Sequence, residues 1–296
     1  MSRPTLHLVD ASLDVFRAWH SVPDEFHDVD GAPVNAVYGF SRFLFDFLEQ
    51  VRPSHAAVAF DESLTSSFRN AIYPAYKANR ELPPESLKRQ FDYCKELAAA
   101  LGCAVLRHDS FEADDLIGSA LVALRGHGFR GVIVSADKDF GQMLGAHDEQ
   151  WDFARDQRWD AAGVKQRLGV HPHQVADYLA LTGDAVDNIP GVPGIGPKTA
   201  ATLLSHFGTL DALYARLDEI PFLRFRGAAA AHAKLRTHAE LARLSRALTA
   251  IAVDAPVPQE PAALARRGVD REAAEALFDR LRFGPLTRAR LRQLAP

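Results

Sequence analysis

The chain has 296 residues, of which 47% are hydrophobic and 24% charged, and its formal net charge is -4. This composition is typical of an ordinary soluble globular protein, long enough for one large domain or two smaller ones. No apolar run approaches the length of a membrane-spanning helix, about 18 residues, and the N-terminus has no apolar signal region. We therefore expect a cytoplasmic protein that makes no membrane contact.

Short apolar runs rich in valine and alanine recur in the first half of the chain, with helical segments between them. This alternation predicts an α/β fold with a parallel sheet covered by helices. Three runs end in aspartate: TLHLVD at Asp10, HAAVAFD at Asp61, and GVIVSADKD at Asp137 and Asp139. Ligands of open parallel sheets bind beyond the carboxyl ends of the strands, so these acids are expected to face one crevice. The alternative is that each aspartate simply begins a loop.

Two segments between these runs have helical periodicity, and we interpret their apolar stripes as core. The first stripe consists of Phe40, Phe43, Leu44, Phe47 and Leu48. The second helix is expected to stop at Gly102. The two cysteines, Cys94 and Cys103, have no CxxC spacing and no nearby histidine in the sequence, so we interpret them as reduced packing residues.

The segment from Glu62 to Phe91 combines basic and aromatic residues with prolines that prevent one uninterrupted helix. Its basic residues can bind a phosphate backbone, and its aromatic residues can stack on the bases of a single strand. A long insert after a strand is also a common origin of a lid. The alternative is a solvated surface loop. The residues concerned are Phe68, Arg69, Tyr73, Tyr76, Lys77, Arg80, Lys88, Arg89 and Phe91.

The stretch FEADDLIGSAL predicts the start of a helix with acids in its first turn. Helical geometry places Glu112 and Asp115 on nearly the same face, whereas Asp114 points away from Glu112. Asp114 is therefore the acid that geometry supports least as a ligand. The alternative for all three is a solvated helix terminus, where the helix dipole favours acids by less than about 1 kcal/mol each.

Residues 181–204, LTGDAVDNIPGVPGIGPKTAATLL, add Asp184 and Asp187 to these acids and contain more glycine and proline than a turn requires. Nine carboxylates near one another need cations, because like charges raise each other's pKa or push the site open. All-oxygen ligation suits Mg²⁺ or Mn²⁺, and two such ions would support hydrolysis of a phosphodiester. Without these nine acids, 29 acids stand against 34 bases, which leaves a basic outer surface. The nine are Asp10, Asp61, Glu112, Asp114, Asp115, Asp137, Asp139, Asp184 and Asp187.

Seven stretches match a known family in order, and SADKDF and GDAVDNIPGVPGIGPKTA are the most specific parts of them. The seven are LHLVDASLDVFRAWHS, YGFSRFL, AFDE followed by FR, YPAYKANR, FEADDLIGSAL, VSADKDFGQML and ALTGDAVDNIPGVPGIGPKTAATLL. Together they resemble the 5′ nuclease (flap endonuclease) family, which includes the 5′→3′ exonuclease domain of bacterial DNA polymerase I. Because the sequence ends at Pro296, without the length of a polymerase, it resembles the stand-alone members.

The resemblance implies a two-metal site whose ligands, direct or through water, are the nine acids. It also implies a helical arch over the site from Phe68 to about residue 90, in which Lys77 and Arg80 contact the scissile phosphate. Residues 191–200 resemble the hairpin of a helix-hairpin-helix (helix-three-turn-helix) element, which binds DNA phosphates and can hold K⁺. The DNA-binding residues expected on these grounds are Arg69, Tyr76, Gly191, Gly194, Gly196, Lys198 and Thr199.

The implied fold is a PIN-like α/β nuclease core over residues 1–170, with a mainly parallel central sheet, followed by a helical DNA-binding part over residues 171–296. The helix-hairpin-helix is expected at about residues 184–207. The implied function is that of a Mg²⁺- or Mn²⁺-dependent 5′→3′ exonuclease and flap endonuclease, a monomer that acts on branched, nicked or flapped DNA in primer removal and repair. Two alternatives remain open: a protein that binds branched DNA with little or no cleavage, and an RNA nuclease that shares only the acidic sheet.

Overall fold

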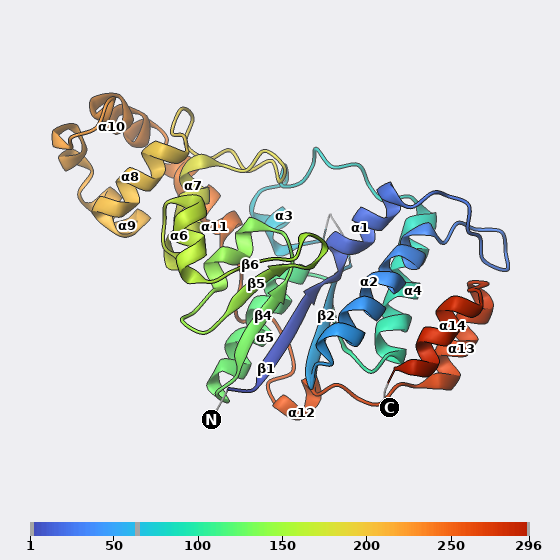
Figure 1. Ribbon diagram of the computed structural model, residues 1–296. Coiled ribbons are helices and arrows are strands. Elements are labelled where there is room, and N and C mark those ends of the chain that lie inside the picture. The colour runs from blue at the N-terminus through green and yellow to red at the C-terminus, as the bar shows by residue number, and fades with distance from the viewer. Residues whose placement is uncertain (1–2, 63–65, 295–296) are drawn as a thin grey trace.

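The computed structural model describes residues 3–62 and 66–294, and a six-stranded sheet forms its centre (Figure 1). The strand order is β3-β2-β1-β4-β5-β6, with the first five strands parallel and β6 antiparallel to β5. This arrangement confirms the predicted mainly parallel α/β sheet. The strands are β1 (Thr5–Asp10), β2 (His55–Asp61), β3 (Ala104–His108), β4 (Arg130–Val134), β5 (Glu149–Asp152) and β6 (Gln157–Trp159).

Helices cover both faces of the sheet, because successive strand residues alternate between two apolar cores. Leu8 faces a core shared with α5, whereas Val9 faces a core shared with α1, α2 and α4. The stripe predicted around Phe40 and Leu44 lies on α2 and is buried, apart from Phe43, which is partly exposed. These helices are α1 (Ala11–Ser21), α2 (Asn35–Val51), α4 (Glu85–Ala100) and α5 (Ala113–Gly126).

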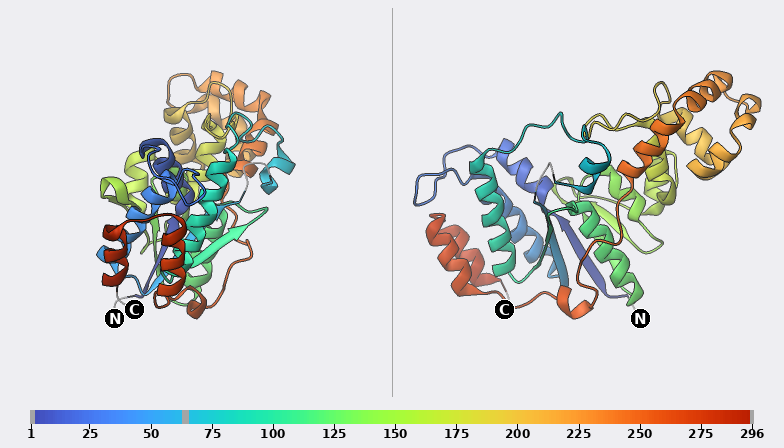
Figure 2. Two further views of the ribbon diagram at one scale, coloured as in Figure 1. Left: turned by 90° about the vertical axis from the view of Figure 1, so that its right-hand side faces the viewer. Right: turned by 180° about the vertical axis from the view of Figure 1, so that it is seen from behind.

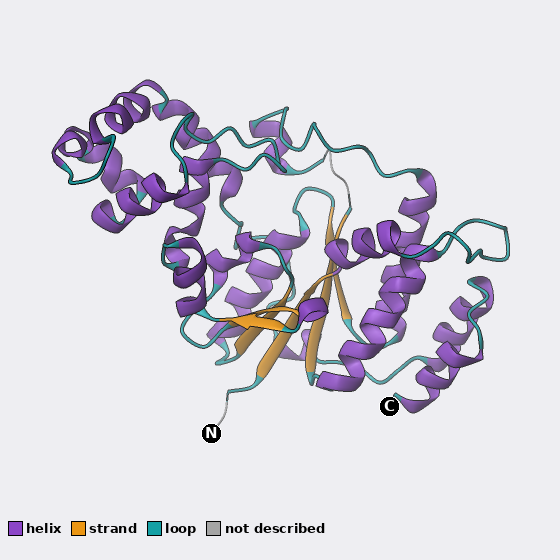
Figure 3. Cartoon of the chain, turned by 45° about the horizontal axis from the view of Figure 1, so that its top comes forward, coloured by secondary structure: helices purple, strands orange, loops and turns teal. Residues whose placement is uncertain are grey.

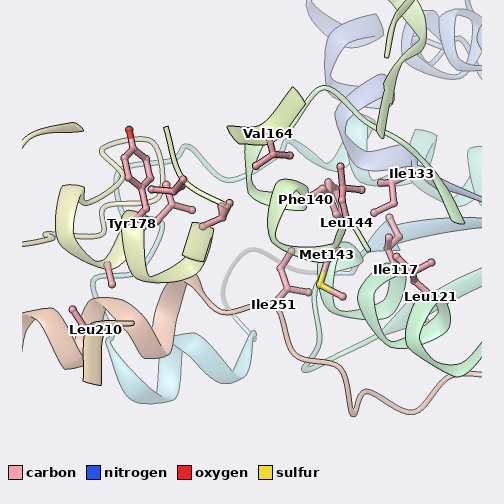
Figure 4. Close-up of a cluster of buried hydrophobic side chains, with 14 of the residues drawn as sticks. Ile117, Leu121, Ile133, Phe140, Met143, Leu144, Val164, Tyr178, Leu210 and Ile251 are labelled. Atoms are coloured by element: carbon pink, nitrogen blue, oxygen red, sulfur yellow. The ribbon is translucent and has the colours of Figure 1, made fainter. Parts of the chain in front are cut away.

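The helical part that follows is joined to the sheet through the core on the α5 side. Figure 4 shows Ile117 and Leu121 of α5 close to Phe140 and Met143 of the turn after β4, with Ile251 beside them. Among the described residues, no helix is both long and apolar enough to cross a membrane. The helices of this part are α6 (Ala161–Leu168), α7 (Val175–Thr182), α8 (Pro197–Phe207), α9 (Leu210–Ala215), α10 (Ala228–Thr237) and α11 (Ala239–Thr249).

The end of the chain does not belong to this helical part, which corrects the prediction of one unit over residues 171–296. After α11 the chain returns along the sheet through α12 (Pro261–Leu264), and α13 (Arg271–Arg280) and α14 (Pro285–Gln293) pack beside α2 and α4 (Figure 2). Phe278 is fully buried against Phe45 of α2. The sequence pattern is helical in both places, and only long-range packing separates them.

The segment predicted to form a helical arch contains little helix. It consists of α3 (Phe68–Ile72), the residues 73–84, which we call the crossing segment, and the start of α4. The crossing segment is built of turns and extended chain, because its prolines lack an N–H and disfavour helix in the preceding residue. It passes above the carboxyl edge of the sheet (Figure 1), where Figure 3 shows several loops. Residues 73–84 therefore do not form the predicted helix.

Candidate active site

Three neighbouring strands carry aspartates to the carboxyl edge of the sheet, as predicted. Asp10 ends β1 and lies level with Ala59 of β2, and its Oδ2 accepts a hydrogen bond of 2.9 Å from the Ser135 hydroxyl, just after β4. Asp61 ends β2, and its Oδ1 accepts from the N–H of Ala113 at the start of α5 (2.8 Å). The parallel register therefore brings together acids that are more than 50 residues apart in the chain.

The electrostatics of this edge indicate carboxylates that face one another. Burial, and then the charge of Asp61, raises the pKa of Asp10 to about 7. Burial, and then the charge of Asp137, raises the pKa of Asp139 to about 7. Each of these groups gives up a proton less readily because it is buried and because other carboxyl groups lie nearby.

Asp114 joins this group, contrary to the weight that helix geometry gave it in the sequence analysis. Burial raises its pKa well above the usual value, followed by the charges of Asp137 and Asp10. Divergence from Glu112 on the helix surface directs Asp114 toward the strand ends, where the other acids lie. A single helix cannot reveal this, because the target of a side chain is set by the neighbouring strands.

Glu112 is bound by three side chains of the α3 and crossing-segment region. Its Oε1 accepts from Lys77 Nζ at 2.8 Å, and its Oε2 accepts from the Tyr76 hydroxyl at 3.0 Å and from Arg69 Nη1 at 3.3 Å. Burial alone would raise the pKa of Glu112, but the charges of Lys77 and Arg69 lower it below the usual value. Glu112 is therefore ionised and already neutralised by protein cations.

Asp115 has a structural role, and its predicted role as a metal ligand is not supported by this geometry. It is fully buried, and a bidentate pair with Arg69 occupies both carboxylate oxygens at 2.8 Å. The N–H groups of Glu112 (3.1 Å) and Ala252 (2.8 Å) complete its hydrogen bonds. Four donors leave little capacity for a cation.

The predicted DNA contacts of Arg69 and Tyr76 are wrong for the same reason. Both side chains are 3% exposed, and Arg69 also donates to the carbonyls of Leu248 (2.9 Å) and Ala250 (2.7 Å) at the end of α11. A guanidinium with all its donors used inside the protein cannot bind a phosphate. These residues instead join α3, α5 and α11 around Glu112.

A second group of acids, Asp184 and Asp187, lies near Asp139. Asp184 Oδ2 accepts from Lys138 Nζ at 2.5 Å, and the same ammonium lies 3.4 Å from Asp139 Oδ1. Burial would raise the pKa of Asp184, but the hydrogen bond from Lys138 lowers it below the usual value. Asp187 pairs with Arg80, although burial keeps the pKa of Asp187 above its usual value.

Within residues 3–62 and 66–294, no three histidine, cysteine or acidic side chains stand together in an arrangement that would hold a metal ion. Glu112, Asp184 and Asp187 are instead paired with Lys77, Lys138 and Arg80. The donor set nevertheless fits a hard divalent cation, because it consists only of oxygens. Asp139 Oδ1 is buried and accepts no hydrogen bond, and burial together with the charges of neighbouring acids raises the pKa values of Asp10 and Asp114.

The predicted hairpin between α7 and α8 divides into a buried half and an exposed half. Gly191 is buried, its N–H donates to the Ser245 hydroxyl (3.0 Å), and a Cβ there would lie 2.2 Å from the backbone nitrogen of Gly183. Gly191 is thus required for close packing, and its predicted DNA contact is wrong. The exposed half consists of Gly194, Gly196 and Lys198, with Thr199 half-buried.

A cavity of about 210 Å³ opens beside Asp61, between α1, α4 and the end of the crossing segment. Phe16, Phe91 and Pro83 line it together with Lys88. Its charged lining is mixed, because Asp61, Glu62 and Asp92 stand beside two lysines, and Lys95 is paired with Glu62 and Asp92.

Sequence reasoning missed three residues of this region. Lys138 lies between two predicted ligands within SADKDF, and Asn79 and Asn188 lie within YKANR and GDAVDN. Their positions inside stretches that match the family were the available signal, and the stretches that hold Lys138 and Asn188 are the most specific ones. No sequence signal identified their partners, because Asn79 and Asn188 donate hydrogen bonds to backbone carbonyls more than 100 residues away in the chain.

Comparison with protein families gives a direct result. Residues 5–169 match the N-terminal, resolvase-like domain of the 5′-3′ exonucleases, and residues 170–272 match their C-terminal SAM-fold domain. The chain belongs to the 5′-3′ exonuclease family. Membership confirms the resemblance and the fold class, and it supports the predicted 5′ nuclease function.

Known relatives agree with this assignment. The chain is 37% identical to DNA polymerase I of Rhizobium leguminosarum over 290 residues, which is 96% of this chain and 28% of that protein. The chain therefore spans less than a third of the length of this relative. Among solved structures, zinc-bound T5 5′-exonuclease has a TM-score of 0.68 at 19% identity, covering 94% of this chain and 99% of that one. The catalytic core of Rad2 in complex with DNA substrate has a TM-score of 0.66 at 16% identity, covering 99% and 93%.

We expect the substitution Arg69→Met to lower the free energy of unfolding by about 3–5 kcal/mol, because it leaves the Asp115 carboxylate buried without its partner. Urea unfolding followed by circular dichroism measures this. Arg243→Met is the matched control, since the Arg243–Glu240 pair is exposed and is expected to contribute less than about 1 kcal/mol. Unchanged stability of Arg69→Met with weakened DNA binding would restore the original prediction of a DNA contact.

The raised pKa of Asp139 predicts a pH dependence of stability in metal-free buffer. A carboxyl group whose pKa is higher in the folded than in the unfolded state stabilises the fold while it is protonated, and this contribution is lost as the pH rises through the folded pKa of about 7. Asp139→Asn is therefore expected to be more stable than the native protein at about pH 8, by on the order of 1 kcal/mol, with the difference fading toward about pH 5. Thermal unfolding in the presence of EDTA tests this. A variant that is less stable than the native protein at alkaline pH would contradict it.

Proposed function

We propose that the protein is a metal-dependent, structure-specific 5′ nuclease that hydrolyses phosphodiesters near the 5′ ends of nicked, flapped or branched DNA. The observation that carries the proposal is the position of Lys77. Its ammonium is buried against Glu112, and the charges of Asp61 and Asp187 also act on it. The Lys77 ammonium thus lies between the acids at the strand ends and Asp187, which precedes the hairpin.

Two groups of acids would hold divalent cations, Mg²⁺ or Mn²⁺. The first is formed by the strand ends and the start of α5, and the second by Asp139, Asp184 and Asp187. When bound, the cations supply a nucleophilic water and neutralise charge on the leaving oxygen. The members of the first group are Asp10, Asp61, Glu112, Asp114 and Asp137.

Lys77 and Arg80 supply the positive charge for the substrate. In the free protein they pair with Glu112 and Asp187, and both side chains would be available to the scissile phosphate if those acids held cations instead. There they offset the negative charge that develops as the bond breaks. The same two residues therefore neutralise the site before substrate arrives and act on the phosphate afterward.

The hairpin would hold the duplex through its phosphates. Gly196 is the N-cap of α8 and offers no side-chain cap, and Pro197 follows it. The first-turn N–H groups of Lys198 and Thr199 have no helical partner and can donate to a phosphate. The Gly194 carbonyl already accepts from Lys234 Nζ at 2.9 Å, so a K⁺ ion at the hairpin carbonyls would have to share or displace this ammonium.

A 5′-labelled flap incubated with Mg²⁺ or Mn²⁺ tests the proposal. We expect a short 5′ product that EDTA abolishes, and cleavage of unstructured RNA that is slower than that of the flap. Binding without product in either metal would favour the alternative of a branched-DNA-binding protein. Equal cleavage of unstructured RNA and flap DNA would favour an RNA nuclease.

The substitution Lys77→Ala is expected to reduce the single-turnover cleavage rate by about 100- to 1000-fold, because it removes a charge that acts on the transition state. Affinity for the flap is expected to fall far less. Lys165→Ala on α6, which removes an exposed lysine away from the acids, is the matched control and should cleave at the native rate. A loss confined to KM would make Lys77 a simple contact to the DNA backbone.

A further inference from the structure

Two segments that are far apart in the sequence meet above the carboxyl edge of the sheet. One is the crossing segment, residues 73–84, and the other is residues 184–189, which we call the acid turn because it contains Asp184 and Asp187. Figures 1 and 2 show the loop after α3 and the loop after α7 running side by side in this region. Each segment carries part of the proposed machinery, so the contact between them sets the spacing of that machinery.

The backbone of the acid turn is held by donors of the crossing segment. The N–H of Lys77 donates to the carbonyl of Asp187 at 3.0 Å. The side-chain amide of Asn79 donates to the carbonyls of Ala185 (3.0 Å) and Val186 (3.4 Å). Three successive carbonyl groups of the turn therefore accept hydrogen bonds from one short stretch of the crossing segment.

The contact is reciprocal. The side-chain amide of Asn188 donates to the carbonyl of Ala75 at 2.7 Å, so each segment sends an asparagine to the backbone of the other. Asn188 and Lys77 both have left-handed backbone conformations, with φ of 55° and 54°. This conformation is costly for a lysine, by roughly 1–2 kcal/mol, and persists only where surrounding contacts impose it.

An apolar cluster lies beneath the hydrogen bonds. Tyr76 of the crossing segment and Ile189 of the acid turn are both buried and pack with Leu248 of α11. The acid turn is also closed on itself, since Asp184 and Ile189 exchange backbone hydrogen bonds of 2.9 and 2.8 Å. Beyond the contact, Leu82 is 66% exposed, so the crossing segment is held at its middle and open toward α4.

We infer that Asn79 and Asn188 form a latch that joins the crossing segment to the acid turn and sets the distance between Lys77 and Asp187. This inference rests on the proposed function, in which the ion pairs of Lys77 and Arg80 are exchanged for phosphate and metal. The latch uses amide donors and backbone carbonyls, which such an exchange does not disturb. Asn79 and Asn188 are thus positioning residues that keep the two backbones together while the charged side chains change partners.

Hydrogen exchange of the metal-free and DNA-free protein tests the latch without any activity. In Asn79→Ala, amides of both residues 73–82 and residues 184–190 are expected to exchange about 2- to 10-fold faster, because two exposed hydrogen bonds across the contact are lost. Asn79→Gln, which keeps an amide donor, should restore part of the protection. Glu81→Gln, an exposed neighbour, is the matched control and should exchange as the native protein does.

Kinetics on a 5′ flap test the positioning role. We expect Asn79→Ala and Asn188→Ala each to lower the single-turnover rate about tenfold while the Kd for the flap stays within about twofold of native. The double substitution is expected to lower the rate by less than the product of the two single effects, because both asparagines maintain one contact.

Three results would overturn the latch. Faster exchange confined to residues 73–82, with residues 184–190 protected as in the native protein, would show that Asn79 stabilises only its own segment. Native cleavage rates in both variants would show that the contact positions nothing, and strictly multiplicative effects would show independent roles. If the native protein cleaves no flap at all, the proposed function fails, and the exchange experiment still decides whether the two segments are coupled.

Discussion

The structure depends on one electrostatic constraint: carboxylates from four parts of the chain converge on the carboxyl edge of a parallel sheet. Burial and mutual repulsion raise the pKa values of Asp10, Asp114 and Asp139, so each acid added to the group makes the next harder to ionise. The protein balances part of this charge with its own cations, Lys77 and Lys138 among them. The remaining repulsion is what a divalent cation would relieve.

The cations are placed by packing that extends well beyond the site. Arg69 is buried between α3, α5 and α11, and its bidentate pair with Asp115 fixes the base of the crossing segment. Tyr76 and Lys77 reach Glu112 from that base, and the acid turn holds the middle of the segment. In the proposed reaction the charged side chains change partners, while the neutral contacts and the buried Arg69–Asp115 pair stay as they are.

Much of this could be predicted from the sequence, because local chemistry carried the signal. The apolar runs predicted the sheet, and parallel strands that end at Asp10 and Asp61 or shortly before Asp137 could place those acids only at one edge. The wrong assignments, at Arg69, Tyr76 and Gly191, share a cause: each residue type suits a DNA contact, but the residue is buried by partners distant in the sequence. The sequence analysis supported Asp115 better than Asp114 as a ligand, whereas the structure places Asp114 near the other acids and pairs Asp115 with Arg69. Helix periodicity shows which residues share a face, but not what that face meets.

The sequence by itself determined the family, the mainly parallel sheet and the set of acids, since motif order and strand periodicity are local properties of the chain. Tertiary structure alone decided which acid is a structural partner and which is available, because that depends on whether a cation such as Arg69 lies beside it. It also decided that the last helices return to α2 and α4, and that Asn79 reaches the backbone near Asp187. These contacts join residues that are 100 or more positions apart in the sequence, and the pattern of side chains along the chain does not identify such partners.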